Sequence, residues 1–143
     1  MAGKGNTFEN DLLKLIFNAT AIANIADNTA TSPLTNLYVS LHTGNIDETG
    51  TQTTNECSYT GYARVAVARS DSGWTVTDNS VSPAASITFG ACTVGSETAT
   101  HWAVGTAETS TGKVLYYGEI EPDIVISPGV TPYLTTASTV TED

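Results

Sequence analysis

The side chains that could do chemistry in this chain are few and far apart. Its only histidines are His42 and His101, and its only cysteines are Cys57 and Cys92. Structural zinc sites usually present their ligands in close sequence pairs, and no two of these four residues lie within a few positions of each other. We therefore expect no metal site, and nothing else in the sequence indicates a cofactor.

Catalytic groups are not indicated either. A Ser-His-Asp triad assembles from distant positions, so sequence order does not exclude one, but the chain has no strained Gly-x-Ser-x-Gly elbow. Glycosidases need two carboxylates at a suitable separation, and fifteen acidic residues make such a pair too easy to propose to count as evidence. The sequence predicts that the protein is not an enzyme.

The segment Asn45–Gly50 has oxygen ligands near a glycine, as calcium loops do. It lacks their regular alternation and their terminal bidentate Glu, so we interpret it as part of a solvated acidic loop over residues 43–58. This loop is rich in Gly, Asn, Thr and acid and has no apolar periodicity. Loops of this length in compact domains are usually functional or mobile.

The two cysteines leave two alternatives open. Each lies in or beside a β-like segment, where a free cysteine behaves as a small buried hydrophobe, and we favour this interpretation for Cys57 and Cys92. A disulfide is the alternative, because sequence does not place their Cα atoms.

Aromatic residues are candidates for a sugar-binding platform. In strands such residues more often pack in the core or across strands, so the platform is the less favoured interpretation. The seven residues are Tyr59, Tyr62, Trp74, Trp102, Tyr116, Tyr117 and Tyr133.

The composition limits the partners of the protein. Five basic against fifteen acidic residues give a net charge of -10, which disfavours nucleic acid because phosphate neutralisation supplies most non-specific affinity. No stretch has the roughly 18 apolar residues that a spanning helix needs, and the start lacks the pattern of a secretory signal. We expect a single domain over residues 1–143, made in the cytoplasm, that binds neither nucleic acid nor membrane.

One amphipathic helix is predicted near the start, over about residues 7–27. Asn6 and Thr7 are good N-cap residues, and apolar residues recur at spacings of three and four. The helix either closes its own domain, which we favour, or docks on a partner. Its apolar positions are Phe8, Leu12, Leu15, Ile16, Ala19, Ile22 and Ala26.

The rest of the chain favours short strands. Alternation predicts a strand over residues 37–42 and another over 62–69, with a turn at Asp71–Gly73 leading into a hairpin with residues 74–77. Pro83 should lie at a sheet edge or a bulge. We expect a mainly β fold, an antiparallel β-sandwich of jelly-roll type with one N-terminal amphipathic α-helix. Further strands are predicted over residues 80–89, 101–107, 113–120, 124–126 and 133–140.

Four segments together resemble a family of small proteins encoded among the structural genes of tailed bacteriophages. They cover residues 8–21, 37–43, 59–65 and 129–137, so the resemblance runs over nearly the whole chain. Members are often labelled as tail-fibre-like, and similar small β-sandwich proteins serve as decoration or cement proteins on icosahedral heads. The family pattern supplies no catalytic residues.

The resemblance and the acidic charge together lead us to expect a capsid decoration (cement) protein on the outer surface of the phage head. Its partners would be the major capsid protein and further copies of itself, as a dimer or trimer. The alternative is a tail or tail-fibre component that recognises a host surface receptor or glycan. The predicted interface residues are Phe8, Leu12, Phe17, Asp47, Glu48, Tyr59 and Tyr62.

Overall fold

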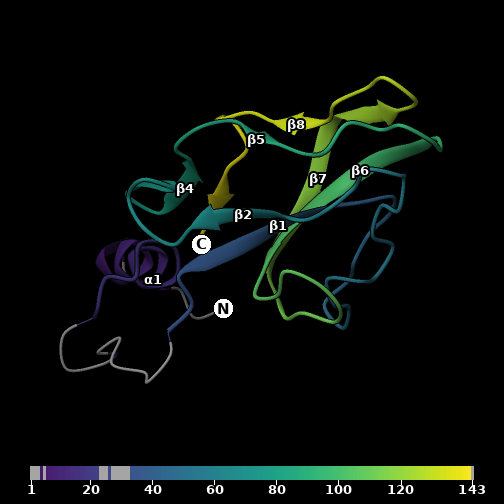
Figure 1. Cartoon of the computed structure of the whole chain (residues 1–143). Helices are drawn as coiled ribbons and strands as arrows, with labels where there is room; N and C mark the ends of the chain where they lie inside the picture. Colours follow the sequence, from purple (N-terminus) through teal and green to yellow (C-terminus); the bar gives the residue numbers. More distant parts are fainter. Residues whose placement is uncertain (1–3, 5, 23–25, 27–32, 143) are drawn as a thin grey trace. The chain divides into compact units, whose positions relative to one another are not determined.

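A computed structural model describes residues 4, 6–22, 26 and 33–142 (Figure 1). The chain divides into two compact units. The first unit comprises Met1–Asn36, Val67–Ile87 and Leu134–Asp143, and the second comprises Leu37–Ala66 and Thr88–Tyr133. The elements in chain order are α1 (Asn6–Asn18), β1 (Asn36–His42), β2 (Val65–Ala68), β3 (Trp74–Thr77), β4 (Ser80–Pro83), β5 (Ile87–Thr88), β6 (Glu97–Gly105), β7 (Val114–Ile126), β8 (Tyr133–Leu134) and β9 (Val140–Thr141).

In the first unit, helix α1 packs on strands β3 and β4. Its apolar face buries Leu13 and Phe17 completely. The ring of Phe17 meets the buried Trp74 of β3 edge to face, with 4.8 Å between the ring centroids. The favoured interpretation, in which the helix closes part of its own domain, agrees with this packing.

The predicted length of the helix is wrong, because α1 ends at Asn18 and not near residue 27. Ala19 adopts a left-handed φ of 54°, which stops a helix. The Arg69 guanidinium then donates to the last carbonyls, from Nε to Ile16 at 2.6 Å and from Nη2 to Leu15 at 2.5 Å. Burial lowers the pKa of Arg69.

Beyond the helix, Ile22 and Ala26 form an isolated antiparallel bridge, with backbone hydrogen bonds of 2.9 and 2.8 Å. Both residues were predicted to be helical. Their apolar spacing fits a helix, but the backbone has already left the helical conformation at Ala19. The rest of the predicted helix, residues 23–25 and 27, lies outside the described residues.

The sheet of the first unit has the strand order β3-β4-β9. The turn at Asp71–Gly73 exists, with the Gly73 amide donating to Ser70, but the predicted hairpin between β2 and β3 is wrong. Strand β3 pairs with β4 instead, through the tight turn Asp78–Asn79, in which Asp78 has a φ of 51° that Asp tolerates well. Pro83 ends β4, beyond the two residues that pair with β9.

Most residues of a second sheet, with the strand order β2-β1-β6-β7, belong to the second unit. Strand β1 pairs antiparallel with β6, so that Val39 lies opposite Val104 and Leu41 opposite Trp102. All four of these side chains are buried. Because side chains alternate along a strand, the intervening residues of β1 face the other side of the sheet.

Strand β7 is one long strand where the sequence predicted two. Its register against β6 shifts between the pairs Ala99↔Ile124 and His101↔Glu119, which leaves a bulge that contains Pro122. Proline lacks the N–H that a ladder needs, so it is tolerated at a bulge. The strand lies at one edge of its sheet, and three of the four exposed residues over positions 119–123 are acidic: Glu119, Glu121 and Asp123.

The predicted fold class is confirmed: the protein is mainly β, with antiparallel sheets and one N-terminal helix in the described part of the chain. No helix among the described residues is long and apolar enough to cross a membrane. The assignment of the whole chain to one domain stays a prediction.

Candidate functional site

The two ends of the acidic loop over residues 43–58 are bonded to each other, and one of them is also bonded to β1. The amide of Thr43 donates to Asn55 at 2.7 Å, and the amide of Cys57 donates to Leu41 of β1 at 2.9 Å. Asp47 and Glu48 are exposed on this loop, as a solvated loop predicts. Ile46 and Gln52, however, are buried, so parts of the loop belong to the core.

Gln52 is the buried anchor of this loop. Its Nε2 donates to the carbonyl of Tyr38 at 3.3 Å, and its Oε1 accepts from the amide of Ala107 at 3.0 Å. The backbone amide of Gln52 donates to the carbonyl of Gly112 at 3.1 Å. Gln52 therefore fixes the loop to β1 and to the connection between β6 and β7.

Gly105 and Gly112 leave the space that Gln52 fills, because a Cβ at either position would overlap its amide. We expect Gly105→Ala to lower the free energy of unfolding by about 1–3 kcal/mol. The further loss caused by Gly105→Ala should nearly vanish in a chain that already carries Gln52→Ala. Urea unfolding of the two single variants and the double variant measures this coupling. Gly118→Ala is the control, since its Cβ would make only an ordinary contact with Trp102 at 3.7 Å. Equal costs with and without Gln52 would contradict this account.

His42 lies at the end of β1 and is completely buried. Its Nδ1 bonds the carbonyl of Thr54 at 2.8 Å, which requires a proton on Nδ1, and its Nε2 then accepts from the Ser40 hydroxyl at 2.8 Å. Burial lowers the pKa of His42. This Ser-His pair is not exposed to a substrate, and its third partner is a carbonyl, so its role is to hold the loop.

The lowered pKa of His42 predicts an acid-sensitive fold. The unfolded chain takes up a proton at its ordinary pKa of about 6.5, whereas the folded chain resists it. The free energy of unfolding should therefore fall as pH decreases below about 6.5, with a slope of up to about 1.4 kcal/mol per pH unit. Unfolding in urea between pH 7 and 5 measures the slope. His42→Gln should reduce it, and an unchanged slope in that variant would contradict the assignment.

Arg64 is the centre of a second polar cluster. It forms a two-pronged ion pair with Glu56, from Nε at 2.7 Å and from Nη2 at 2.8 Å. It also donates to the carbonyls of Ala107 at 2.9 Å and Ser110 at 2.8 Å. The Arg64 side chain is only 3% exposed, and its carboxylate partner raises its pKa. One guanidinium thus connects the acidic loop to the connection between β6 and β7.

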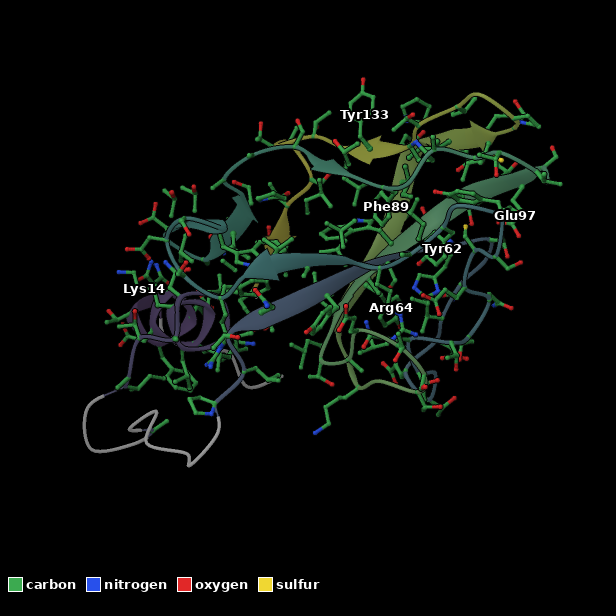
Figure 2. All side chains as sticks on the ribbon, in the orientation of Figure 1. Lys14, Tyr62, Arg64, Phe89, Glu97 and Tyr133 are labelled. Atoms are coloured by element: carbon green, nitrogen blue, oxygen red, sulfur yellow. The ribbon has the colours of Figure 1, made fainter. Side chains whose placement is uncertain are left out.

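Tyr62 completes this cluster, which we call the Arg64 cluster: Glu56, Tyr62 and Arg64. The Tyr62 hydroxyl donates to Glu56 at 2.9 Å and accepts from the amide of Leu41 at 3.1 Å. Burial, with the nearby Glu56 carboxylate, raises the pKa of Tyr62, so the phenol keeps the proton that it donates. Figure 2 labels Tyr62 and Arg64.

The cysteines are buried and free. This confirms the interpretation of Cys57 and Cys92 as small core residues. Burial, together with the carboxylate of Glu97, raises the pKa of Cys57 to about 12, so its thiol stays protonated. Glu97 itself accepts hydrogen bonds from the amides of Ser58 and Tyr59. No group of three or more His, Cys, Asp and Glu residues in the described ranges could hold a metal ion.

The seven aromatic residues do not form one platform. Tyr59, Trp74 and Trp102 are buried. Tyr117 and Tyr133 are the large exposed ones, and the 57% exposed Tyr133 points away from the ribbon in Figure 2.

The predicted interface residues are dispersed over the two units. Phe17 and Tyr59 are buried inside the chain and so are not available to a partner in this structure, whereas Phe8 is 40% exposed and Leu12 is half-buried. Asp47 and Glu48 are exposed, and Tyr62 belongs to the Arg64 cluster. The assignment of these residues to an interface stays a prediction.

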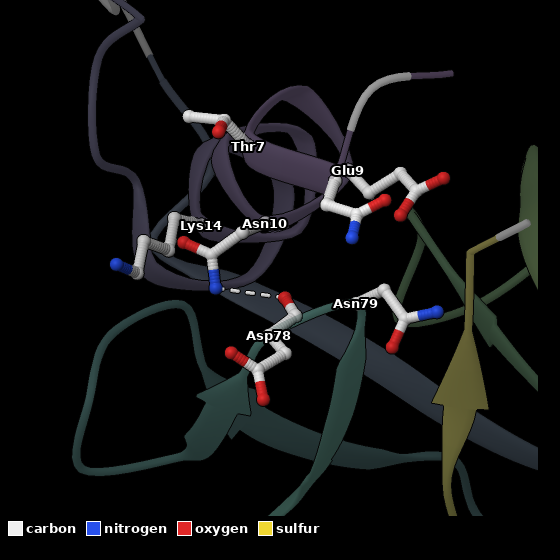
Figure 3. A pocket seen from close by; sticks show the side chains of 7 residues that line it. Thr7, Glu9, Asn10, Lys14, Asp78 and Asn79 are labelled. Atoms are coloured by element: carbon white, nitrogen blue, oxygen red, sulfur yellow. Dashed lines mark hydrogen bonds between the residues drawn. The ribbon is translucent and has the colours of Figure 1, made fainter.

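A groove in the first unit was not predicted from the sequence. It runs between α1 and the Asp78–Asn79 turn and has a volume of about 770 Å³. In Figure 3 the side chain of Asn10 donates to the carbonyl of Asp78, at 2.7 Å. All of its lining residues are polar or charged: Asn6, Thr7, Glu9, Asn10, Lys14, Asp78 and Asn79. Only their meeting in the fold makes the groove, so no local sequence signal identifies it.

The fold and these sites define a small, mainly β protein, whose buried polar groups hold loops in place. Comparison with known protein families identifies the family. The chain belongs to the family described as Podophage GP4 fiber I protein gp80, whose pattern matches residues 3–141. No curated protein matches the chain.

Family membership confirms the resemblance to structural proteins of tailed phages, and with it a place in the virion. The fiber description fits the tail-fibre alternative better than the capsid decoration role that we expected from the sequence.

Proposed function

We propose that the chain is a component of a phage tail fibre that recognises a receptor or glycan on the host surface. The observation that carries this proposal is the family match over residues 3–141, because the family is described as a fiber protein. The exposed Tyr117 and Tyr133 and the polar groove of the first unit supply surfaces of the kind that bind such ligands.

Competition for adsorption tests the receptor part of this proposal. Purified full-length chain, mixed with host cells before the phage is added, should slow phage adsorption in a dose-dependent way. Bovine serum albumin at the same concentration is the control. A chain that neither binds the host cells nor slows adsorption would contradict receptor recognition.

Capsid decoration is the second candidate. The net charge of -10 favours it, because an acidic protein is repelled by packaged DNA and suits the outside of a head. In that role the partner would be the major capsid protein. Copy number separates the two candidates, since a fibre component should be present in a handful of copies per virion and a decoration protein in hundreds. Quantitative mass spectrometry of purified virions measures it.

We also propose that the chain forms a low-order homo-oligomer, because closed rotational symmetry is the usual solution for small identical parts. Light scattering coupled to size-exclusion chromatography measures the mass in solution. A dimer or trimer agrees with the proposal, and a strict monomer at high concentration contradicts it.

A further inference from the structure

We propose that an uncharged patch on the second unit is the surface through which two copies of this chain contact each other. The neutral patch, as we call it, consists of residues 88–96 and 124–133. The chain carries five basic and fifteen acidic residues, yet none of them lies in either segment. This inference rests on the low-order homo-oligomer proposed above and assigns its contact surface.

Backbone hydrogen bonds hold the two segments of the neutral patch side by side. The amide of Cys92 donates to the carbonyl of Val130 at 2.8 Å, and the amide of Gly129 donates to the carbonyl of Cys92 at 2.9 Å. Phe89, Cys92 and Ile126 are buried, so the patch rests on packed core side chains. A surface that is already held in place loses little conformational entropy when it binds.

The neutral patch carries the three most exposed large apolar side chains of the part of the chain that the structure describes. Val125 is 68% exposed, Val94 is 64% exposed and Tyr133 is 57% exposed. The centres of protein interfaces are depleted in charged residues and enriched in tyrosine, so this composition favours a protein partner. The other exposed residues of the patch are small or uncharged: Thr88, Gly90, Ala91, Thr93, Gly95, Ser96, Pro128, Gly129 and Thr131.

The net charge of the chain indicates why this partner is a second copy. At a net charge of -10 two copies repel each other, and a contact between their acidic surfaces would place like charges opposite each other. A two-fold contact brings the same surface of each copy together. The neutral patch is therefore compatible with itself, whereas a basic partner would be drawn to the acidic surfaces instead.

Carboxylates border the neutral patch at Glu97 and Asp123 without entering it. Glu97 is already engaged, because it accepts from the amides of Ser58 and Tyr59. Asp123 is exposed and would stay in solvent at the rim of the contact, where charged groups are common. A contact through the patch covers Tyr133 and leaves Tyr117 and the groove beside α1 available to a receptor.

Sedimentation equilibrium of the full-length chain over a range of concentrations tests the proposal. Val125→Glu should weaken self-association about tenfold or more, because it places a carboxylate inside the contact on each copy. The matched control is Leu34→Glu, which introduces the same charge at a 43% exposed apolar position outside the patch. The control should change the association much less.

Salt gives a second measurement that needs no variant. Raising the ionic strength from about 10 mM to about 150 mM shortens the Debye length from about 30 Å to about 8 Å, which screens the repulsion between copies. Association through an uncharged patch should therefore strengthen several-fold. A contact made of ion pairs would weaken instead, and that result would overturn the proposal.

NMR spectra of the unaltered ¹⁵N-labelled chain, recorded at increasing concentration, locate the contact even if Val125→Glu does not fold. The amide signals of residues 88–96 and 124–133 should shift. An oligomer whose shifts are confined to other residues, or that Val125→Glu and Leu34→Glu weaken equally, overturns the patch assignment while the homo-oligomer stands. A chain that stays monomeric contradicts both, and competition for phage adsorption decides receptor recognition separately.

Discussion

Replacing Arg64 by methionine is expected to lower the free energy of unfolding by about 3–5 kcal/mol. The substitution removes both bonds to Glu56 and leaves the carbonyls of Ala107 and Ser110 without their donor. The Glu56 side chain is only 16% exposed, and in the variant its carboxylate has no counter-charge. The loss is large because an unpaired buried charge destabilises the folded state by more than the intact ion pair stabilises it.

Urea unfolding followed by tryptophan fluorescence measures this loss. Lys113→Met is the matched control, because it removes a positive charge from an exposed position and should change the stability by less than about 0.5 kcal/mol. Arg64→Lys should fall between the two, since lysine keeps the charge but not the planar fork. A loss below about 1 kcal/mol for Arg64→Met would show that the Arg64 cluster does not hold the loop.

The second large effect is expected at Phe17. Phe17→Ala should lower the free energy of unfolding by about 3–5 kcal/mol, because it empties a fully buried position and removes the ring contact with Trp74. Phe8→Ala, on the same helix but 40% exposed, should cost well under 1 kcal/mol.

Chemical denaturation of both phenylalanine variants measures the difference. Both residues were predicted to lie in an interface. The comparison separates a core role, expected for Phe17, from a surface position, expected for Phe8. Should the two variants be destabilised equally, the packing of α1 on β3 would not be what holds the first unit together.

Local patterns predicted those parts of the fold that depend on local geometry. Alternation of apolar residues located strand β1, which spans Asn36–His42, because burial of one sheet face imposes a period of two. The start of the helix could also be predicted, since Asn6 and Thr7 are good N-cap types and α1 begins at Asn6.

The errors have a common cause in contacts between distant parts of the chain. Helix α1 ends at Asn18, where Arg69 caps it from more than fifty positions away, so periodicity alone overestimated its length. Strand β3 pairs forward with β4 because the positive φ of Asp78 allows a tight turn there.

The same limit applies to the sites. Arg64 bonds carbonyls 43 and 46 positions away, and the groove joins α1 to a turn more than sixty positions further along. Motifs of fixed spacing do not describe such long-range contacts, so the roles of Gln52, the Arg64 cluster and the groove beside α1 could not be predicted from local sequence patterns. His42 is an example of the reverse: a residue type with catalytic potential that holds a loop in place.

The edge strand β7 has a consequence for how copies of the protein behave before they are assembled. An unpaired strand edge is a template on which further chains add and aggregate. Here its middle part carries Glu119, Glu121 and Asp123 beside the kink at Pro122. Like charges repel between two such edges, and the bulge spoils their hydrogen-bond register. Two copies therefore do not readily pair along this strand before they are built into a virion.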